Sequence, residues 1–273
     1  MLQKIEHFCR HFAKYNDAYA LIGGAACTAW YSDHIPSFRG TEDLDIVLIL
    51  ECMDIQFAET FHDYINRSGY KIRERIDLEQ DGVSRKILYR FSEPEDTGAP
   101  AQLELLSRKG DALHLVPGQR IVPVKAQDQY TGLSCIVLDD TYYHFFREHI
   151  SRDKGIPRPT IPVLMILKIK ACLNLFHQWQ QGEAHGSDSS RNNIRKHRND
   201  VFFMLFDVVQ ETDALHLPEA IQVDVREFLR EYQATSPEWQ GIFDHLRKRR
   251  GSGATTGLTP EDLLNALTSL FYL

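Results

Sequence analysis

Two aspartates, Asp43 and Asp45, stand two residues apart at the start of an aliphatic run that ends at residue 50. If this run is a strand, both side chains project from the same face and their carboxylates lie close together. Two like charges so close favour a shared cation or a raised pKa. Oxygen ligands in this number suit Mg²⁺, which keeps coordination positions for substrate phosphates. The pair predicts a Mg²⁺ site; the alternative is an acidic strand start at a solvent-exposed edge.

A third carboxylate, Glu104, lies within the short apolar run of residues 101–106. Burying a carboxylate in such a strand costs free energy unless a partner compensates for it. We therefore expect Glu104 to join Asp43 and Asp45 in one metal site. The alternative is that Glu104 faces water on an edge strand.

Gly23 and Gly24 follow the apolar run of residues 19–22 and precede a helix-compatible segment, residues 25–31. Paired glycines allow a tight turn and bring peptide N–H groups close to a ligand. The N-terminus of the following helix would favour an anion there. The pattern therefore favours a phosphate-binding turn, whereas an ordinary turn is the alternative.

Together these residues resemble the DNA polymerase β-type nucleotidyltransferase superfamily, and within it the branch that contains the AbiEii and MenT toxins of bacterial toxin–antitoxin systems. The superfamily pattern is Gly-Gly or Gly-Ser, Asp-x-Asp on the next strand, and a third acidic strand residue. The branch adds Arg-x-Ser/Thr-x before Asp-x-Asp, a Lys-x-x-Ala helix, and a helix with Lys or Arg before Asp. Residues 39–45, 168–171 and 196–200 match these additions, and Gly24 stands where the wider superfamily often has serine.

The resemblance implies a role for each matching residue. Gly23 and Gly24 would hold nucleotide phosphates, Asp43 and Asp45 would bind metal, and Glu104 would be the third ligand or the general base. Lys168 would neutralise the triphosphate, with Lys170 as the alternative. The remaining residues that the resemblance assigns to nucleotide binding are Arg39, Thr41, Lys196 and Asp200.

By resemblance, the expected activity is Mg²⁺-dependent transfer of an NMP from an NTP to an acceptor hydroxyl. A tRNA 3′ end or another RNA would be the acceptor, and an antitoxin protein would be a further partner. Two alternatives stay open. One is a small-molecule, antibiotic-type nucleotidyltransferase, and the other is an inactive module on the same fold that binds a nucleotide or a protein partner.

The elements around these motifs predict an α/β (α+β) fold, in which a small mixed-sheet domain over residues 1–145 precedes a helical domain over residues 146–273. By resemblance, the first domain would be the nucleotidyltransferase domain. Residues 93–100 read as a hairpin connection and residues 182–190 as a loop. Apolar alternation predicts strands over residues 19–22, 44–50, 70–76, 86–91 and 102–106. Helical periodicity predicts helices over residues 2–15, 25–31, 55–65, 162–179, 192–209, 223–232 and 261–272.

Composition and charge are those of an ordinary globular protein: 273 residues, 43% hydrophobic, with a formal net charge of −7. This composition excludes disorder, collagen and coiled coil. The charge is unevenly distributed, since residues 42–63 hold seven acids and no Lys or Arg, while residues 147–198 hold ten basic residues against four acids. Arg191, Arg195, Lys196 and Arg198 are candidates for RNA phosphate contacts. A solvated helix face is the alternative.

The five cysteines are scattered, without a C-x-x-C pair, which predicts reduced thiols and neither a zinc site nor a disulfide framework. The N-terminus carries no apolar signal region. The longest apolar runs, residues 46–50 and 163–167, are much shorter than the roughly 20 residues that span a bilayer. We therefore expect a cytoplasmic protein with no membrane partner.

Overall fold

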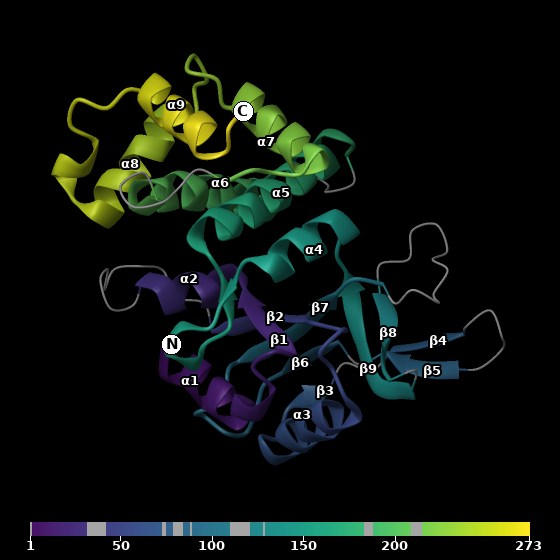
Figure 1. The fold of residues 1–273 in the computed structure, drawn as a ribbon. Helices are drawn as coiled ribbons and strands as arrows, with labels where there is room; N and C mark the ends of the chain where they lie inside the picture. Colours follow the sequence, from purple (N-terminus) through teal and green to yellow (C-terminus); the bar gives the residue numbers. More distant parts are fainter. Residues whose placement is uncertain are drawn as a thin grey trace. The chain divides into compact units, whose positions relative to one another are not determined.

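The chain divides into two compact units, Met1–Pro159 and Thr160–Leu273. The computed structural model describes residues 2–31, 42–72, 75–78, 84–87, 89–109, 121–127, 129–182, 188–208 and 215–273. The first unit contains a mixed sheet with interspersed helices, and the second contains helices α5–α9 (Figure 1). The predicted α/β class is confirmed. The domain limit expected after residue 145 falls within α4 (Asp140–Glu148), which belongs to the first unit.

The main sheet has the strand order β1-β2-β7-β6-β3, with β9 pairing to β7 and β8 pairing to β9. The β2–β7 and β7–β9 pairs are parallel, whereas β1–β2, β6–β7, β3–β6 and β8–β9 are antiparallel. The strands of this sheet are β1 (Tyr19–Ile22), β2 (Asp43–Leu48), β3 (Lys71–Ile72), β6 (Arg90–Ser92), β7 (Gln102–Ser107), β8 (Ile121–Ala126) and β9 (Gln129–Val137).

Alternation along β2 and β7 separates an apolar face of the sheet from an acidic one. Leu44, Ile46 and Leu48 are fully buried, while Asp43 is exposed and Asp45 is half-buried. On β7, buried Leu103 and Leu105 alternate with half-buried side chains in the same way. The sequence pattern therefore turns all three predicted metal-binding acids away from the core.

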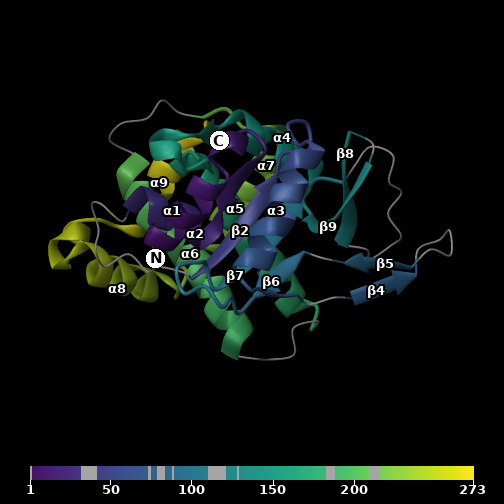
Figure 2. The same cartoon turned by 90° about the horizontal axis from the view of Figure 1, so that it is seen from below.

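Helices α1 (Leu2–His11) and α3 (Ile55–Arg67) cover the apolar face. Phe8 of α1 and Phe12, directly after α1, contact Phe61 of α3, with Phe12 and Phe61 ring centroids 5.7 Å apart. Figures 1 and 2 show α3 and α4 on opposite sides of the sheet. Helix α2 (Gly23–Tyr31) follows β1 directly, so the turn between them lies at one edge of the acidic face.

Several predicted elements need correction around the hairpins. The predicted strand over residues 70–76 is two strands, β3 and β4 (Arg75–Leu78), and the one over residues 86–91 spans β5 (Ser84–Ile87) and the start of β6. β4 and β5 form a separate two-stranded sheet. Residues 93–100 do connect antiparallel strands, as expected, since Glu93 N donates to Ala101 O (3.1 Å).

A buried arginine stabilises the end of the first unit. Arg158 is 1% exposed, lies 4.0 Å from the ring centroid of Trp30, and donates to the carbonyls of Asp153 and Ile156. Burial lowers the pKa of its guanidinium. Leu21 N of β1 donates to Pro157 O (2.8 Å), so residues 157–158 pack against β1 and α2.

In the second unit, α5 and α6 pack along one another, and α6 also contacts α8 and α9. Thr259 is the N-cap of α9 and forms a capping box with Asp262. Two corrections apply here: α6 begins within the predicted loop, at residue 188, and α8 was not among the predicted helices. The helices are α5 (Ile161–Gln180), α6 (Asp188–Val208), α7 (Glu219–Glu231), α8 (Trp239–Arg250) and α9 (Pro260–Leu270).

By length and composition α5 is apolar enough to cross a membrane, and half of its most apolar stretch is buried within the protein. The core helix of a soluble protein passes the same test, so α5 is weak evidence either way. None of the five cysteines, all of which lie in the described residues, forms a disulfide, and four of them are buried. Burial raises the pKa of the Cys135 thiol to about 12, which keeps it neutral.

Candidate functional site

One row of residues crosses four strands of the main sheet and carries most of the predicted acidic site. Ile22 of β1 pairs with Asp45 of β2, Asp45 pairs with Glu104 of β7, and Glu104 pairs with Arg90 of β6. Side chains at paired positions project from the same face of a sheet, and neighbouring strands lie about 4.8 Å apart. We call Asp45, Glu104 and Arg90 the acidic row.

Asp43 lies two residues before Asp45 on β2 and shares its face. Burial and the neighbouring Glu42 raise the pKa of the Asp43 carboxyl, and the charge of Arg90 acts in the opposite direction. The two aspartates and Glu104 are therefore brought to one face by alternation on β2 and by the parallel register of β2 with β7. Their role as metal ligands stays a prediction.

Gly23 lies directly against the Asp45 carboxylate. A Cβ at position 23 would stand 2.3 Å from Asp45 Oδ2, and the backbone there has φ +62°, which L side chains rarely adopt. Both observations require glycine at this position. Gly23 is also the first residue of α2, so the start of a helix lies against an acid of the site. Gly24 O accepts a hydrogen bond from Thr28 Oγ1 (2.9 Å) within α2.

Arg90 binds Glu104. Arg90 Nε donates to Glu104 Oε1 at 2.9 Å, and Arg90 Nη2 donates to the same oxygen. The pair is mostly shielded, with side-chain exposures of 33% for Arg90 and 16% for Glu104. The bond to Glu104 raises the pKa of the Arg90 guanidinium, and the charge of Asp45 raises it further. Glu104 is therefore neither on a wet edge strand nor free to bind a metal in this arrangement.

Sequence reasoning did not single out Arg90. The signal that identifies it is hairpin register: β6 and β7 are joined by residues 93–101, and Ser92 pairs with Gln102. Counting back two residues from Ser92 and forward two from Gln102 pairs Arg90 with Glu104. The hairpin was predicted from the sequence, but its register was not used to find the residue opposite Glu104.

The residues of the acidic face fit a divalent cation in part. Asp43 and Asp45 offer the oxygen donors that Mg²⁺ prefers, and Gly23 leaves the space beside Asp45 Oδ2 that a side chain would fill. In the part of the chain that the structure describes, no group of three or more His, Cys, Asp or Glu side chains is arranged to hold a metal ion. The aspartate pair therefore suits an ion that also takes phosphate ligands. Glu104 would become a further ligand of this ion only after its bond to Arg90 is broken.

Lys168 of α5 and Asp200 of α6 form an ion pair within the helical unit, with Lys168 Nζ 2.8 Å from Asp200 Oδ2. The Lys168 side chain is 5% exposed. Lys170 instead pairs with Asp224 of α7, also at 2.8 Å, so the two lysines do not face one partner. Lys196 is half-buried one turn before Asp200 on α6. The part of these residues in a site with the aspartates stays a prediction.

Two predicted nucleotide-binding residues, Arg39 and Thr41, lie outside the described residues. Of the proposed RNA contacts, Arg191 and Arg195 are exposed, and Arg191 lies 5.4 Å from the ring centroid of Trp179. The prediction that Arg198 contacts RNA at the surface is wrong, because Arg198 is only 2% exposed and its guanidinium binds Asn199 and Glu238. The sequence could not separate it from its neighbours, since only packing of α6 against α8 decides which basic residue faces inward.

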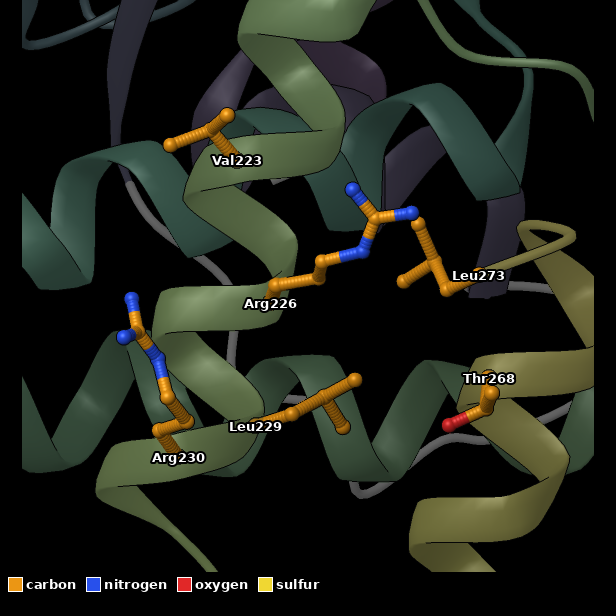
Figure 3. Close-up of a pocket in the computed structure, with 6 residues that line it drawn as sticks. All are labelled: Val223, Arg226, Leu229, Arg230, Thr268 and Leu273. Atoms are coloured by element: carbon orange, nitrogen blue, oxygen red, sulfur yellow. The ribbon is translucent and has the colours of Figure 1, made fainter.

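A hollow of about 520 Å³ lies elsewhere in the helical unit, beside α7, and contains none of the predicted site residues (Figure 3). Its lining residues are Val223, Arg226, Leu229, Arg230, Thr268 and Leu273.

Comparison of the sequence with models of protein families and with curated proteins finds no match. The family resemblance therefore rests on the motif residues alone.

Proposed function

We propose that the protein is a Mg²⁺-dependent nucleotidyltransferase that moves an NMP from an NTP to an acceptor hydroxyl. The observation that carries this proposal is the meeting of Asp43, Asp45 and Glu104 on one sheet face, with Gly23 against Asp45 at the start of a helix. A phosphate-binding turn beside paired carboxylates is what phosphoryl-transfer chemistry needs.

Each residue has a distinct task in this proposal. Asp43 and Asp45 would hold the ion, which would supply positive charge to the attacking hydroxyl and to the pyrophosphate leaving group. The first N–H groups of α2, beginning at Gly23 and Gly24, donate to the triphosphate. Glu104, once released from Arg90, acts as a further ligand or accepts the proton of the acceptor hydroxyl.

The acceptor that we favour is an RNA 3′ end, as in the toxins that the motif residues resemble. The excess of base over residues 147–198 supports a polyanionic acceptor, and Arg191 and Arg195 are its exposed members on α6. Lys168 is proposed to neutralise the triphosphate, which requires it to exchange Asp200 for phosphate.

Labelled NTPs and total tRNA, incubated with the full chain and Mg²⁺, test the activity. We expect label transfer, and we expect Asp43→Asn and Asp45→Asn to lower it by at least about a hundredfold, because removal of one charge-stabilising group commonly costs that much. Asp63→Asn, an exposed acid of α3, is the matched control. Transfer by the Asp45→Asn variant at the unsubstituted rate would show that the acidic site is misassigned.

A second candidate function is a nucleotide-binding module without catalysis. The observations that favour it are the engagement of Glu104 by Arg90 and the lack, among the described residues, of three acids arranged around one ion. Calorimetry of NTP binding with and without Mg²⁺ separates the two functions. Metal-independent binding without label transfer to tRNA or to hydroxylated antibiotics would favour the module.

A further inference from the structure

Arg90 is the cation of the acidic row. Its strand β6 borders the half of β7 that carries Glu104, and the antiparallel register sets the two residues opposite one another. Two guanidinium nitrogens converge on the same oxygen, Glu104 Oε1. A charge-assisted bond of this kind is stronger than a neutral one and fixes the carboxylate in one orientation.

Arg90 lies on the same face of the sheet as all three acids. Asp45 pairs with Glu104 across β2 and β7, and Asp43 lies two residues before Asp45 on the same face. Glu104 is the direct partner of Arg90. Arg90 therefore places a positive charge at the β6 end of the acidic row.

A divalent cation and Arg90 compete for the Glu104 carboxylate. Glu104 Oε1 accepts two N–H groups, which engages its lone pairs, and the guanidinium beside it repels a cation that approaches Oε2. Glu104 can enter a coordination sphere only after Arg90 has moved away. The 33% exposure of the Arg90 side chain leaves it a path into solvent.

We propose that Arg90 is a latch that holds Glu104 out of the metal site, so that the Arg90–Glu104 bond and coordination of a divalent cation by Glu104 exclude one another. This inference rests on the proposed function, because it takes Asp43 and Asp45 as the metal-binding pair. It adds a positioning residue that works through Glu104.

The test is a double-mutant cycle on the full chain, read as Mn²⁺ affinity from the loss of the free Mn²⁺ electron paramagnetic resonance signal. The four proteins are the unsubstituted chain, Arg90→Gln, Glu104→Gln and the double variant. We expect Arg90→Gln to bind Mn²⁺ about tenfold more tightly when Glu104 is present, in keeping with the release of a charged hydrogen bond. With Gln at position 104 the same substitution should change affinity less than about threefold.

The cycle distinguishes a latch from simple charge repulsion. If Arg90 acted only through its charge, its removal would tighten Mn²⁺ binding by the same factor with Glu or Gln at position 104. That result would overturn the latch. Arg67→Gln removes an exposed arginine of α3 that pairs with Asp63, and it should leave Mn²⁺ affinity unchanged.

Asp45→Asn separates failure of the latch from failure of the proposed function. Loss of Mn²⁺ binding in this variant, together with additive effects in the cycle, would overturn the latch and keep the metal site. Unchanged Mn²⁺ binding in Asp45→Asn would overturn both.

A second readout follows Arg90 itself. In a ¹H–¹⁵N spectrum of arginine Nε groups, the Arg90 signal is assigned by its loss in Arg90→Gln. We expect saturating Mg²⁺ to move this signal toward the position of a solvent-exposed arginine in the unsubstituted chain and to leave it in place in Asp45→Asn. An unmoved signal in a chain that binds Mg²⁺ would overturn the latch.

Discussion

At the scale of single residues, the contact between Gly23 and Asp45 places a severe constraint on the site. The clash distance of 2.3 Å is far below the separation that real Cβ atoms show, and the left-handed backbone adds strain of its own. The carboxylate can turn away, so a side chain at position 23 should displace Asp45 more than it unfolds the protein.

Gly23→Ala should therefore lose Mn²⁺ affinity about tenfold or more, and should lose about 1–2 kcal/mol of the free energy of unfolding through the positive φ. Gly155→Ala is the matched control, since Gly155 has φ +68° and a Cβ added there would meet no heavy atom within 4 Å. Urea denaturation should show similar losses for both variants. Equal Mn²⁺ binding by both would mean that Asp45 does not need the space at Gly23.

At the scale of elements, the end of β2 is attached to α4 by a cluster around Glu51. Glu51 accepts hydrogen bonds from Tyr143 (2.7 Å) and from Arg108 Nε (3.0 Å), and Arg147 Nη1 lies 3.1 Å away. Burial alone would raise the pKa of Glu51, but the bonds from Tyr143, from its own backbone N–H and from Arg108 outweigh burial and lower this pKa to about 2. The cluster therefore favours the ionised carboxylate.

This lowered pKa predicts a pH dependence of stability. A carboxyl whose pKa is lower in the folded state stabilises the protein above its unfolded pKa, near the ordinary value of 4.5, and loses that contribution as the pH falls toward about 2. Glu51→Gln should flatten the loss of unfolding free energy between about pH 5 and pH 3, measured by urea denaturation. Glu59→Gln, at an exposed position of α3, should keep the original slope.

The two lysine pairs of α5 differ in burial, which predicts different costs for breaking them. Asp200→Ala leaves the 5% exposed Lys168 ammonium with less compensation and should lower the free energy of unfolding by about 2–3 kcal/mol. Asp224→Ala, opposite the 33% exposed Lys170, should cost about 1 kcal/mol or less. Thermal or urea denaturation of both variants checks this order. A larger loss for Asp224→Ala would mean that burial does not control the two pairs.

The sequence predicted elements well where one residue pattern decides them, and poorly where pairing decides them. Tyr19–Ile22 and the cores of α3, α5 and α7 follow from apolar spacing. β8 and β9 were not predicted, because they contain Pro123 and Gly132, which are unfavourable within strands, and because pairing of β9 with both β7 and β8 decides them. Arg90 was not predicted as a site residue for the same reason, because the register of a hairpin places it opposite Glu104.

At the scale of the whole molecule, the net charge of −7 is the sum of segments with opposite charge, acidic over residues 42–63 and basic over residues 147–198. The base excess of residues 147–198 is smaller at the surface than the sequence count indicates, because Arg158, Lys168 and Arg198 are buried. Arg191 and Arg195 remain exposed on α6. Any electrostatic attraction of RNA to this segment must therefore come from few side chains.

The Arg191→Gln/Arg195→Gln double variant should bind tRNA more weakly, and its plot of log affinity against log salt should be shallower by about one to two, since each lost phosphate contact removes about 0.7–0.9 from the slope. Filter binding between about 50 and 200 mM salt measures this slope, a range over which such contacts weaken markedly. Lys248→Gln/Arg249→Gln, in the basic end of α8, is the charge-matched control. Equal slopes for the two double variants would contradict a specific role for α6.

The contact between Gly23 and Asp45 also has an evolutionary consequence. The two positions are coupled by space, so a change at one alters what selection tolerates at the other. In a library that randomises both, alanine at position 23 should survive selection for folding more often beside Ser or Ala at position 45 than beside Asp. Related chains that have lost the acid at position 45 should therefore also have replaced the glycine at position 23. Paired replacement of both residues would identify relatives in which the site is no longer functional.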